Sequence, residues 1–255
     1  MISHPFDLSG QVAVVTGARR GIGAGIAVAL AEAGADIVGV SATLEESGSV
    51  VQKAVEQVGR RFTAYRADFS DRAAVQRLSD DITQRHGTID ILVNNAGDIR
   101  RSPAVDYLDE DWDHVLEVDL TAQFVLARNL GRGMVERGRG KIIFTASLLS
   151  FQGGINIVAY TAAKSGVAGI TKALANEWAM HGVNVNAVAP GYIETDNTAP
   201  LRGDPARFKA ISDRIPAGRW GTPADIGGAV VFLASRAADY IHGVTLPVDG
   251  GWLGR

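Results

Sequence analysis

Short apolar runs rich in β-branched residues recur along the chain and alternate with longer segments of helical character. Runs of this kind are typical of strands buried on both faces, as in parallel sheets. The predicted strands cover residues 11–16, 36–40, 62–66, 89–93, 141–145, 183–188 and 244–248. The predicted helices between them cover residues 22–33, 48–58, 71–86, 110–137, 160–180 and 223–234.

This alternation predicts the fold class. Strands separated by helices of this length pair in parallel through right-handed crossovers. We therefore expect a single doubly wound α/β domain of the Rossmann type over residues 1–255, with about seven strands and helices on both faces of the sheet. One segment breaks the alternation. Residues 194–221 are rich in Pro, Gly, Asp and Arg, and we expect them to form a substrate loop or lid.

Composition narrows the function classes. Hydrophobic residues make up 46% of the 255 residues, enough for a sizeable core, and the net charge of -3 gives no basis for binding nucleic acid or an acidic membrane. The absence of cysteine excludes disulfides, thiolate nucleophiles and cysteine-ligated zinc, and we expect no metal. Neither a signal peptide within the first ten residues nor a membrane span is indicated. We expect a cytoplasmic protein.

A glycine-rich turn, TGARRGIG at residues 16–23, lies between the first predicted strand and helix. Gly17 permits a tight turn, Gly21 lets the backbone approach a pyrophosphate, and Gly23 lets the helix pack close to the sheet. The free N–H groups at the helix start then face the phosphates. The strand-turn-helix context supports a dinucleotide site. Its candidate residues are Gly17, Arg19, Arg20, Gly21, Ile22 and Gly23.

The choice between NAD and NADP depends on the end of the second strand. NAD users usually carry a carboxylate there, which holds the ribose 2′-OH. This chain has Ser41 at that place, so no carboxylate repels a 2′-phosphate. Arg20 suits pairing with such a phosphate, although Arg19 and Arg20 are equally explained as solvated loop charges. The cofactor is therefore expected to be NAD or NADP.

Three residues carry the predicted chemistry. Ser147 follows a strand at the carboxyl edge, where open α/β sheets bind ligands, and Tyr160 and Lys164 share one face of the next helix at spacing i, i+4. A free phenol has a pKa of about 10, which a nearby ammonium lowers. Tyr160 is therefore predicted to donate the proton when a hydride reduces a ketone. Lys164 would tune it and bind the nicotinamide ribose, and Ser147 would hydrogen-bond the substrate oxygen.

The Gly-x3-Gly-x-Gly spacing, the NNAG at residues 94–97 and the Ser147, Tyr160 and Lys164 set together resemble the short-chain dehydrogenase/reductase family, over residues 8–255. The resemblance implies that Asp68 holds the adenine and that Asn95, Ala96 and Gly97 border the ribose. It also implies a homotetramer. The segment after the sixth strand is implied to hold the nicotinamide carboxamide, through Pro190, Gly191, Ile193 and Thr195.

A fourth catalytic position of the family is usually Asn. The matching residue here is Asp119, which lacks the amide donor. Two roles stay open for it. Asp119 holds a water near Lys164, or it is a buried carboxylate satisfied by backbone N–H groups.

Further stretches narrow the resemblance to family members that act at C5 of a sugar acid, 2-dehydro-3-deoxy-D-gluconate or gluconate. These stretches are IRR at 99–101, LSFQGG at 149–154, ANEWA at 175–179, DRIPAGRWG at 213–221 and VDGGWL at 248–253. Such members lean toward NAD. A sugar acid needs a cation for its carboxylate and polar groups for its hydroxyls. The candidate substrate residues are Arg101, Gln152 and Asn197, with Arg100, Asn156 and Arg202 on the same loops.

Two other functions compete with this one. A 3-oxoacyl-thioester reductase on the same scaffold would also suit the Ser41 region, but the stretches at 149–154 and 213–221 favour the sugar acid. A non-enzymatic nucleotide-binding sensor would typically have lost Tyr160 or Lys164, and both are present.

Overall fold

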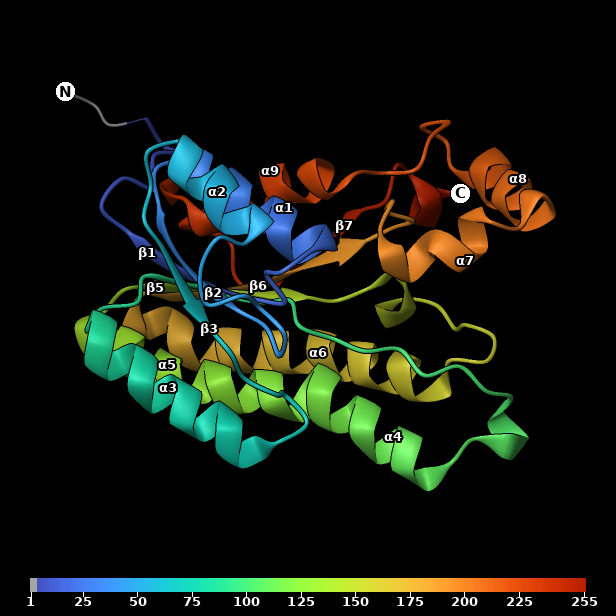
Figure 1. The fold of residues 1–255 in the computed structure, drawn as a ribbon, viewed down its shortest axis with the longest axis horizontal. Helices are drawn as coiled ribbons and strands as arrows, with labels where there is room; N and C mark the ends of the chain where they lie inside the picture. The colour runs from blue at the N-terminus through green and yellow to red at the C-terminus, as the bar shows by residue number, and fades with distance from the viewer. Residues whose placement is uncertain (1–3) are drawn as a thin grey trace.

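The computed structural model describes residues 4–255 and contains one parallel sheet of seven strands (Figure 1). The strand order is β3-β2-β1-β4-β5-β6-β7, and all neighbours are parallel. This order confirms the predicted doubly wound fold. The strands are β1 Val12–Thr16, β2 Asp36–Val40, β3 Phe62–Tyr65, β4 Ile91–Asn94, β5 Gly140–Thr145, β6 Val183–Pro190 and β7 Thr245–Val248.

Helices cover both faces of the sheet. In Figure 1, α1, α2 and α9 lie on one face and α3 to α6 on the other, while α7 and α8 lie beyond the carboxyl ends of the strands. The helices are α1 Gly21–Glu32, α2 Val50–Gln57, α3 Arg72–His86, α4 Asp109–Leu116, α5 Ala122–Arg137, α6 Val158–Trp178, α7 Ala199–Arg202, α8 Pro205–Arg214 and α9 Pro223–Ala234.

Each face of the sheet has its own hydrophobic core. Successive strand residues point to opposite faces, so Leu92 of β4 joins the core under α5 and α6, whereas Ile91 and Val93 join the core under α1 and α9. All three are fully buried. Burial on both faces explains why the strands appear in the sequence as continuous apolar runs.

Two predicted elements differ from the structure. The strand expected at residues 89–93 runs from Ile91 to Asn94, and just before it the Asp90 carboxylate accepts the Val12 N–H at 3.0 Å. The helix expected at residues 110–137 is one helical path, but a π-helical turn, Glu117–Thr121, separates α4 from α5. Such turns often occur at functional sites.

The segment at residues 194–221 is more ordered than a plain loop, since it contains α7 and α8. Its two ends are joined: Glu194 N donates to Gly221 O, and Gly221 N donates to Tyr192 O, both at 2.9 Å. The segment is therefore a closed excursion of the chain whose helices lie at the carboxyl edge of the sheet.

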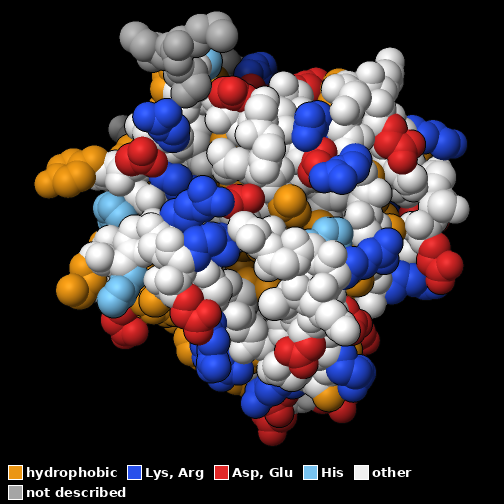
Figure 2. All heavy atoms as spheres, turned by 90° about the vertical axis from the view of Figure 1, so that its left-hand side faces the viewer, with side chains coloured by type: hydrophobic (Ala, Val, Ile, Leu, Met, Phe, Trp, Pro, Cys, Tyr) orange, Lys and Arg blue, Asp and Glu red, His pale blue; other side chains and the backbone are white. Residues whose placement is uncertain are grey.

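The end of the molecule opposite α8 is the amino edge of the sheet. Lys and Arg side chains of the described residues lie among Asp and Glu side chains there, so their charges are mixed on this face (Figure 2). Within residues 4–255, no helix is long and apolar enough to cross a membrane. The expectation about a signal peptide falls partly on residues 1–3, which lie outside the described residues.

Candidate active site

A cavity of about 450 Å³ opens at the carboxyl ends of β1 and β4, where the strand order changes direction. Ligands of open α/β sheets bind at this point. Most of the predicted cofactor residues line the cavity: Gly17, Arg19, Arg20, Gly21, Ile22, Gly23, Ser41, Asp68, Asn95, Ala96, Gly97, Tyr160, Lys164 and Thr195. Pro190, Gly191 and Ile193 do not line it. Ile193 is only 3% exposed.

The glycine turn is shaped by close contacts that exclude side chains. A Cβ at Gly17, where φ is +68°, would lie 2.7 Å from Asn95 Nδ2. A Cβ at Gly23 would overlap the Gly17 carbonyl oxygen and lie 2.6 Å from the same Asn95 atom. A Cβ at Gly21 would meet only the Thr195 side chain, at 3.4 Å from its Cγ2, and Gly21 lines the cavity. Gly17 and Gly23 thus set the shape, and Gly21 presents the backbone to the cavity.

The amino end of α1 has no side-chain cap. The side chain of its N-cap residue, Arg20, makes no capping hydrogen bond, and the first turn contains no acidic residue. The first N–H groups of a helix lack intrahelical acceptors, and the helix dipole favours negative charge near them. The helix start therefore fits a phosphate of a dinucleotide.

Asn95 holds three strands together where the sheet opens. Its side-chain Nδ2 donates to Thr16 O at 3.0 Å, and its backbone N donates to Thr16 Oγ1 at 2.8 Å. Thr145 Oγ1 donates to Asn95 Oδ1 at 3.3 Å. The ends of β1, β4 and β5 are therefore fixed by one amide. Within the described residues, the buried side chain of Asn94 has no hydrogen-bond partner, so only one member of the Asn pair takes this role.

Both arginines of the glycine turn are paired with carboxylates. Arg19 lies 3.2 Å from Glu45, and Arg20 lies 2.8 Å from Asp196 at the start of the 194–221 segment. Ser41 Oγ accepts the Arg19 N–H at 3.1 Å. Residue 41 at the end of β2 is a serine, but Glu45, a little further along the chain, supplies a carboxylate beside Arg19. All four charged side chains are largely exposed.

Asp68 lies at the far end of the cavity from the predicted chemistry. Its carboxylate accepts hydrogen bonds from the backbone N and the hydroxyl of Ser70, at 2.8 Å and 2.7 Å. These bonds hold the pKa of Asp68 below its usual range. Asp68 therefore presents an ionised acceptor to the cavity, as the adenine role requires.

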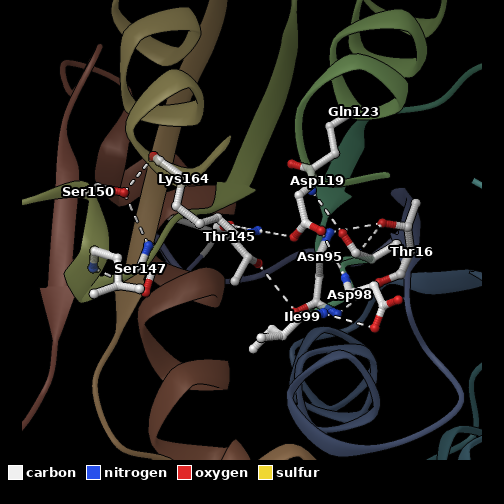
Figure 3. Close-up of polar contacts among 12 residues, drawn as sticks. Thr16, Asn95, Asp98, Ile99, Asp119, Gln123, Thr145, Ser147, Ser150 and Lys164 are labelled. Carbon is white, nitrogen blue, oxygen red and sulfur yellow. Dashed lines mark hydrogen bonds and ion pairs between the residues drawn. The ribbon is translucent and has the colours of Figure 1, made fainter. Parts of the chain in front are cut away.

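Ser147 directly follows β5, and Tyr160 and Lys164 lie on α6. Figure 3 shows Ser147 and Lys164 on these neighbouring elements. Ser147 caps a 3₁₀ turn after β5, and its hydroxyl accepts the Leu149 N–H at 3.2 Å. Lys164 Nζ lies 5.4 Å from the centre of the Tyr160 ring and donates to Thr145 O at 3.0 Å. The ammonium is thus fixed beside the phenol. The Ser147 hydroxyl accepts this hydrogen bond through its oxygen, so its O–H remains a donor that faces Tyr160 or a substrate.

Asp119 forms a buried ion pair with Lys164 (Figure 3). The π-helical turn places its Oδ1 3.1 Å from Lys164 Nζ, and its Oδ2 accepts the Asp98 N–H at 2.9 Å. The Asp119 side chain is 0% exposed. A Cβ at Gly97 would lie 2.5 Å from Asp119 Oδ1, so a glycine is needed here. Asp119 is thus a buried carboxylate that accepts one backbone N–H, in line with the second of its two expected roles. Its other carboxylate oxygen contacts the Lys164 ammonium directly.

The pKa of the Tyr160 hydroxyl is raised overall, and burial is the main cause. The Lys164 ammonium lowers this pKa as expected, but together with a hydrogen bond with Ser147 and the charge of Arg101 it does not offset burial and the Asp119 carboxylate. Burial lowers the pKa of Lys164, but Asp119 and Tyr160 outweigh burial and leave that pKa raised. Lys164 is therefore held protonated beside the phenol.

The three predicted substrate residues occupy different positions. Asn197 lines the cavity. Arg101 is exposed and lies outside the cavity lining, but its charge acts on Tyr160. Gln152 does not line the cavity, and its Oε1 accepts the Trp252 Nε1–H at 3.2 Å.

The cavity also contains a charged cluster of which only Arg100 was expected near the pocket. His114 Nε2 and Arg100 Nη2 each lie 3.0 Å from Asp98 Oδ2, and all three residues line the cavity. No sequence signal identifies His114, because only the packing of α4 decides which of its faces meets the site.

Comparisons with known proteins agree with this geometry. A family model described as "Enoyl-(Acyl carrier protein) reductase" matches residues 17–253. The 2-dehydro-3-deoxy-D-gluconate 5-dehydrogenase of Pseudoalteromonas atlantica is 56% identical over 98% of both chains. That of Escherichia coli is 50% identical over 100% of both chains.

A solved structure has the same fold and a bound dinucleotide. It is a provisionally named, NAD(P)-dependent gluconate 5-dehydrogenase from Beutenbergia cavernae, which binds NADP at low occupancy. It is 47% identical, covers 99% of this chain and 100% of its own, and has a TM-score of 0.95. The chain therefore belongs to the short-chain dehydrogenase/reductase family of oxidoreductases.

Proposed function

We propose that the protein transfers a hydride between NAD(P) and C5 of a sugar acid, interconverting a hydroxyl and a ketone. The observation that carries this proposal is the ammonium of Lys164, fixed 5.4 Å from the Tyr160 ring centre in the cavity that the glycine turn opens. The two relatives named 2-dehydro-3-deoxy-D-gluconate 5-dehydrogenase, at 56% and 50% identity over nearly the whole chain, support that substrate.

In this proposal Tyr160 is the acid and base of the reaction. A bound nicotinamide supplies the hydride during reduction and accepts it during oxidation. Tyr160 protonates the substrate oxygen during reduction and takes that proton back during oxidation. Ser147 donates a hydrogen bond from its hydroxyl to the same oxygen and keeps its proton. Lys164 stabilises the phenolate through its charge, and Asp119 holds Lys164 in place.

The residues around the cavity fit a dinucleotide. The uncapped start of α1 and the backbone of Gly21, which lines the cavity, suit the pyrophosphate. Asp68 suits the adenine, and the residues 95–97 suit the adjoining ribose. Thr195 lines the cavity near the nicotinamide end, whereas Pro190, Gly191 and Ile193 would act through their backbone.

For the cofactor we propose a preference for NADP. Ser41, Arg19 and Arg20 line the same cavity, and an uncharged residue beside two guanidiniums suits a 2′-phosphate better than a ribose 2′-OH alone. We expect Arg20→Ala to raise KM for NADP about tenfold or more, because a charge-assisted hydrogen bond is lost, and to leave KM for NAD unchanged. Steady-state kinetics with both cofactors measure this.

Asp196→Asn is the matched control for that variant. It breaks the same ion pair with Arg20 but keeps the guanidinium. Its KM for NADP should stay equal or fall, since Arg20 is released. An Arg20→Ala variant whose two KM values rise equally would contradict the preference.

Asp119 gives the reaction a testable pH dependence. Its carboxylate raises the pKa of Tyr160, and oxidation of an alcohol needs the phenolate as base. Removing the negative charge in Asp119→Asn lowers the pKa of Tyr160. The rising limb of the oxidation rate should therefore move to lower pH. A pH profile of kcat for oxidation measures this, and a limb that moves to higher pH would contradict the assigned role.

A substrate panel tests the proposed function. Sugar acids with a ketone at C5 and aldonates are compared with an acetoacetyl thioester, using NAD and NADP in parallel. The thioester is included because the matching family model is described by carrier-protein chemistry. We expect higher kcat/KM on the sugar acids. Arg101, Gln152 and Asn197 would contact the substrate, and the segment 194–221, which contains Asn197, would cover it as a lid. Faster turnover of the thioester would favour the acyl reductase, and no turnover of either would favour a sensor.

We also propose that the protein works as a homotetramer in the cytoplasm. Large apolar side chains on or beside the helices of one face stay open to solvent, such as Phe124 at 36% and Met180 at 86% exposure. Light scattering of the purified protein measures the assembly.

A further inference from the structure

An aromatic cluster joins the 194–221 segment to the end of the chain. Trp220 stacks on Phe208 of α8 with ring centres 5.6 Å apart, and Tyr192 lies between Trp220 and Trp252, at 5.3 Å and 4.7 Å. The same buried cluster contains Leu148, the neighbour of Ser147. The lid segment, the chain end and the turn that bears Ser147 therefore share one core.

Trp252 is fixed on several sides within this cluster. The side chain is buried, with the residue only 4% exposed, and the Arg214 guanidinium lies 3.8 Å from the centre of its ring. Gly250 and Gly251 before it have positive φ, and a Cβ at Gly251 would lie 3.0 Å from Pro216. The backbone at Gly250 and Gly251 therefore packs closely on the lid segment, and this packing restricts the orientation of the Trp252 indole.

The indole N–H of Trp252 donates to Gln152 Oε1 at 3.2 Å. Gln152 is held from the other side by its backbone N, which donates to Leu148 O at 3.1 Å. A carboxamide has one acceptor oxygen and one NH₂ donor. Since the indole N–H of Trp252 can only donate, it pairs with the oxygen of the Gln152 carboxamide and leaves the NH₂ group on the other side. Within residues 4–255, no protein group accepts a hydrogen bond from the Gln152 NH₂ group.

We propose that Trp252 is a positioning residue for substrate specificity: it turns the Gln152 carboxamide so that its NH₂ group donates to an acceptor oxygen of the sugar acid. This inference rests on the proposed function. Gln152 lies on the same turn as Ser147, so its donor is fixed relative to the hydroxyl that meets the reacting oxygen. A fixed donor favours substrates with a carboxylate or hydroxyl at that distance and disfavours those with an alkyl chain there, because the amide would lose its partner.

Trp252→Phe tests the inference, because it keeps an aromatic ring in the cluster and removes the N–H donor. We expect KM for the 5-keto sugar acid to rise about three- to tenfold, the effect of one neutral hydrogen bond. The kcat and the KM for the cofactor should stay within about twofold. Gln152→Ala should raise KM equally, and the double variant should raise it no further.

Trp220→Phe is the matched control. Trp220 belongs to the same cluster, but its indole N–H donates to Ser212 Oγ at 3.0 Å, inside the lid segment. A general loosening of the cluster would raise KM in both variants, whereas the proposed role raises it only in Trp252→Phe. Equal KM changes in the two variants, or none in Trp252→Phe, would overturn the inference.

The design separates the inference from the proposed function. A wild-type protein that turns over no sugar acid refutes the function and the inference together. An active wild type with an unaffected Trp252→Phe variant refutes the inference alone. If Trp252→Phe fails to fold, Gln152→Leu takes its place, since Gln152 is partly exposed. An unchanged KM in Gln152→Leu would likewise overturn the inference.

Discussion

Replacing Tyr160 by phenylalanine is expected to lower kcat about 10²- to 10⁴-fold, the contribution of a positioned general acid. The ring and its packing remain, and only the hydroxyl is lost. The dissociation constant for NADPH should stay within about threefold, because in this proposal the glycine turn and the start of α1 carry most of the cofactor affinity. Single-turnover reduction of the keto acid and fluorescence titration of NADPH measure the two quantities.

Tyr240→Phe is the matched control for this variant. It removes the same hydroxyl from a side chain that is 99% exposed, so kcat should not change. A Tyr160→Phe protein with full turnover would refute the proton transfer through Tyr160. Loss of NADPH binding in that variant would instead point to a structural role of the hydroxyl.

Replacing Lys164 by methionine should abolish most turnover and also destabilise the protein. The ammonium that lowers the pKa of Tyr160 is removed, so the phenol loses its tuning. Asp119 is left behind as a fully buried carboxylate without its ion-pair partner. Burial already raises the pKa of Asp119, so the carboxyl must take up a proton or stay charged. We expect the free energy of unfolding to fall by about 3–5 kcal/mol.

A second substitution separates the two effects. Lys164→Met with Asp119→Asn removes the stranded charge, so most of the lost stability should return in urea denaturation, while turnover stays low. Lys172→Met, on the exposed side of the same helix, should change neither quantity. Recovered turnover in the double variant would show that Lys164 is needed only to neutralise Asp119.

The buried pair also explains why the π-helical turn matters. An α-helix that ran unbroken through residues 117–121 would present a different face to α6, because a π turn inserts one extra residue into the helical phase. The turn brings Asp119 to the Lys164 ammonium, and Gly97 leaves the room. The pair is therefore a product of three segments that are distant in the sequence.

Local patterns were enough to predict the fold and the main chemistry. Apolar runs such as residues 11–16 indicated strands buried on both faces because each is short and β-branched. The glycine turn was recognisable since it stands between a strand and a helix. Tyr160 and Lys164 were predicted to lie together because an i, i+4 spacing on one helix fixes their distance without knowledge of the rest of the chain.

The contacts that refine the site depended on tertiary structure. Glu45 beside Arg19, Asp196 beside Arg20 and Trp252 beside Gln152 join residues far apart in the sequence, in the last case by 100 positions. No periodicity encodes such contacts, because they arise when loops at the carboxyl edge of the sheet pack on one another. The helices of the 194–221 segment were missed for a related reason, since α7 is only four residues long and short helices depend on packing rather than propensity. The sequence alone therefore determined the class of fold and the proposed proton donor. The tertiary structure decided which charges surround that donor, because only folding brings together side chains that the chain keeps apart.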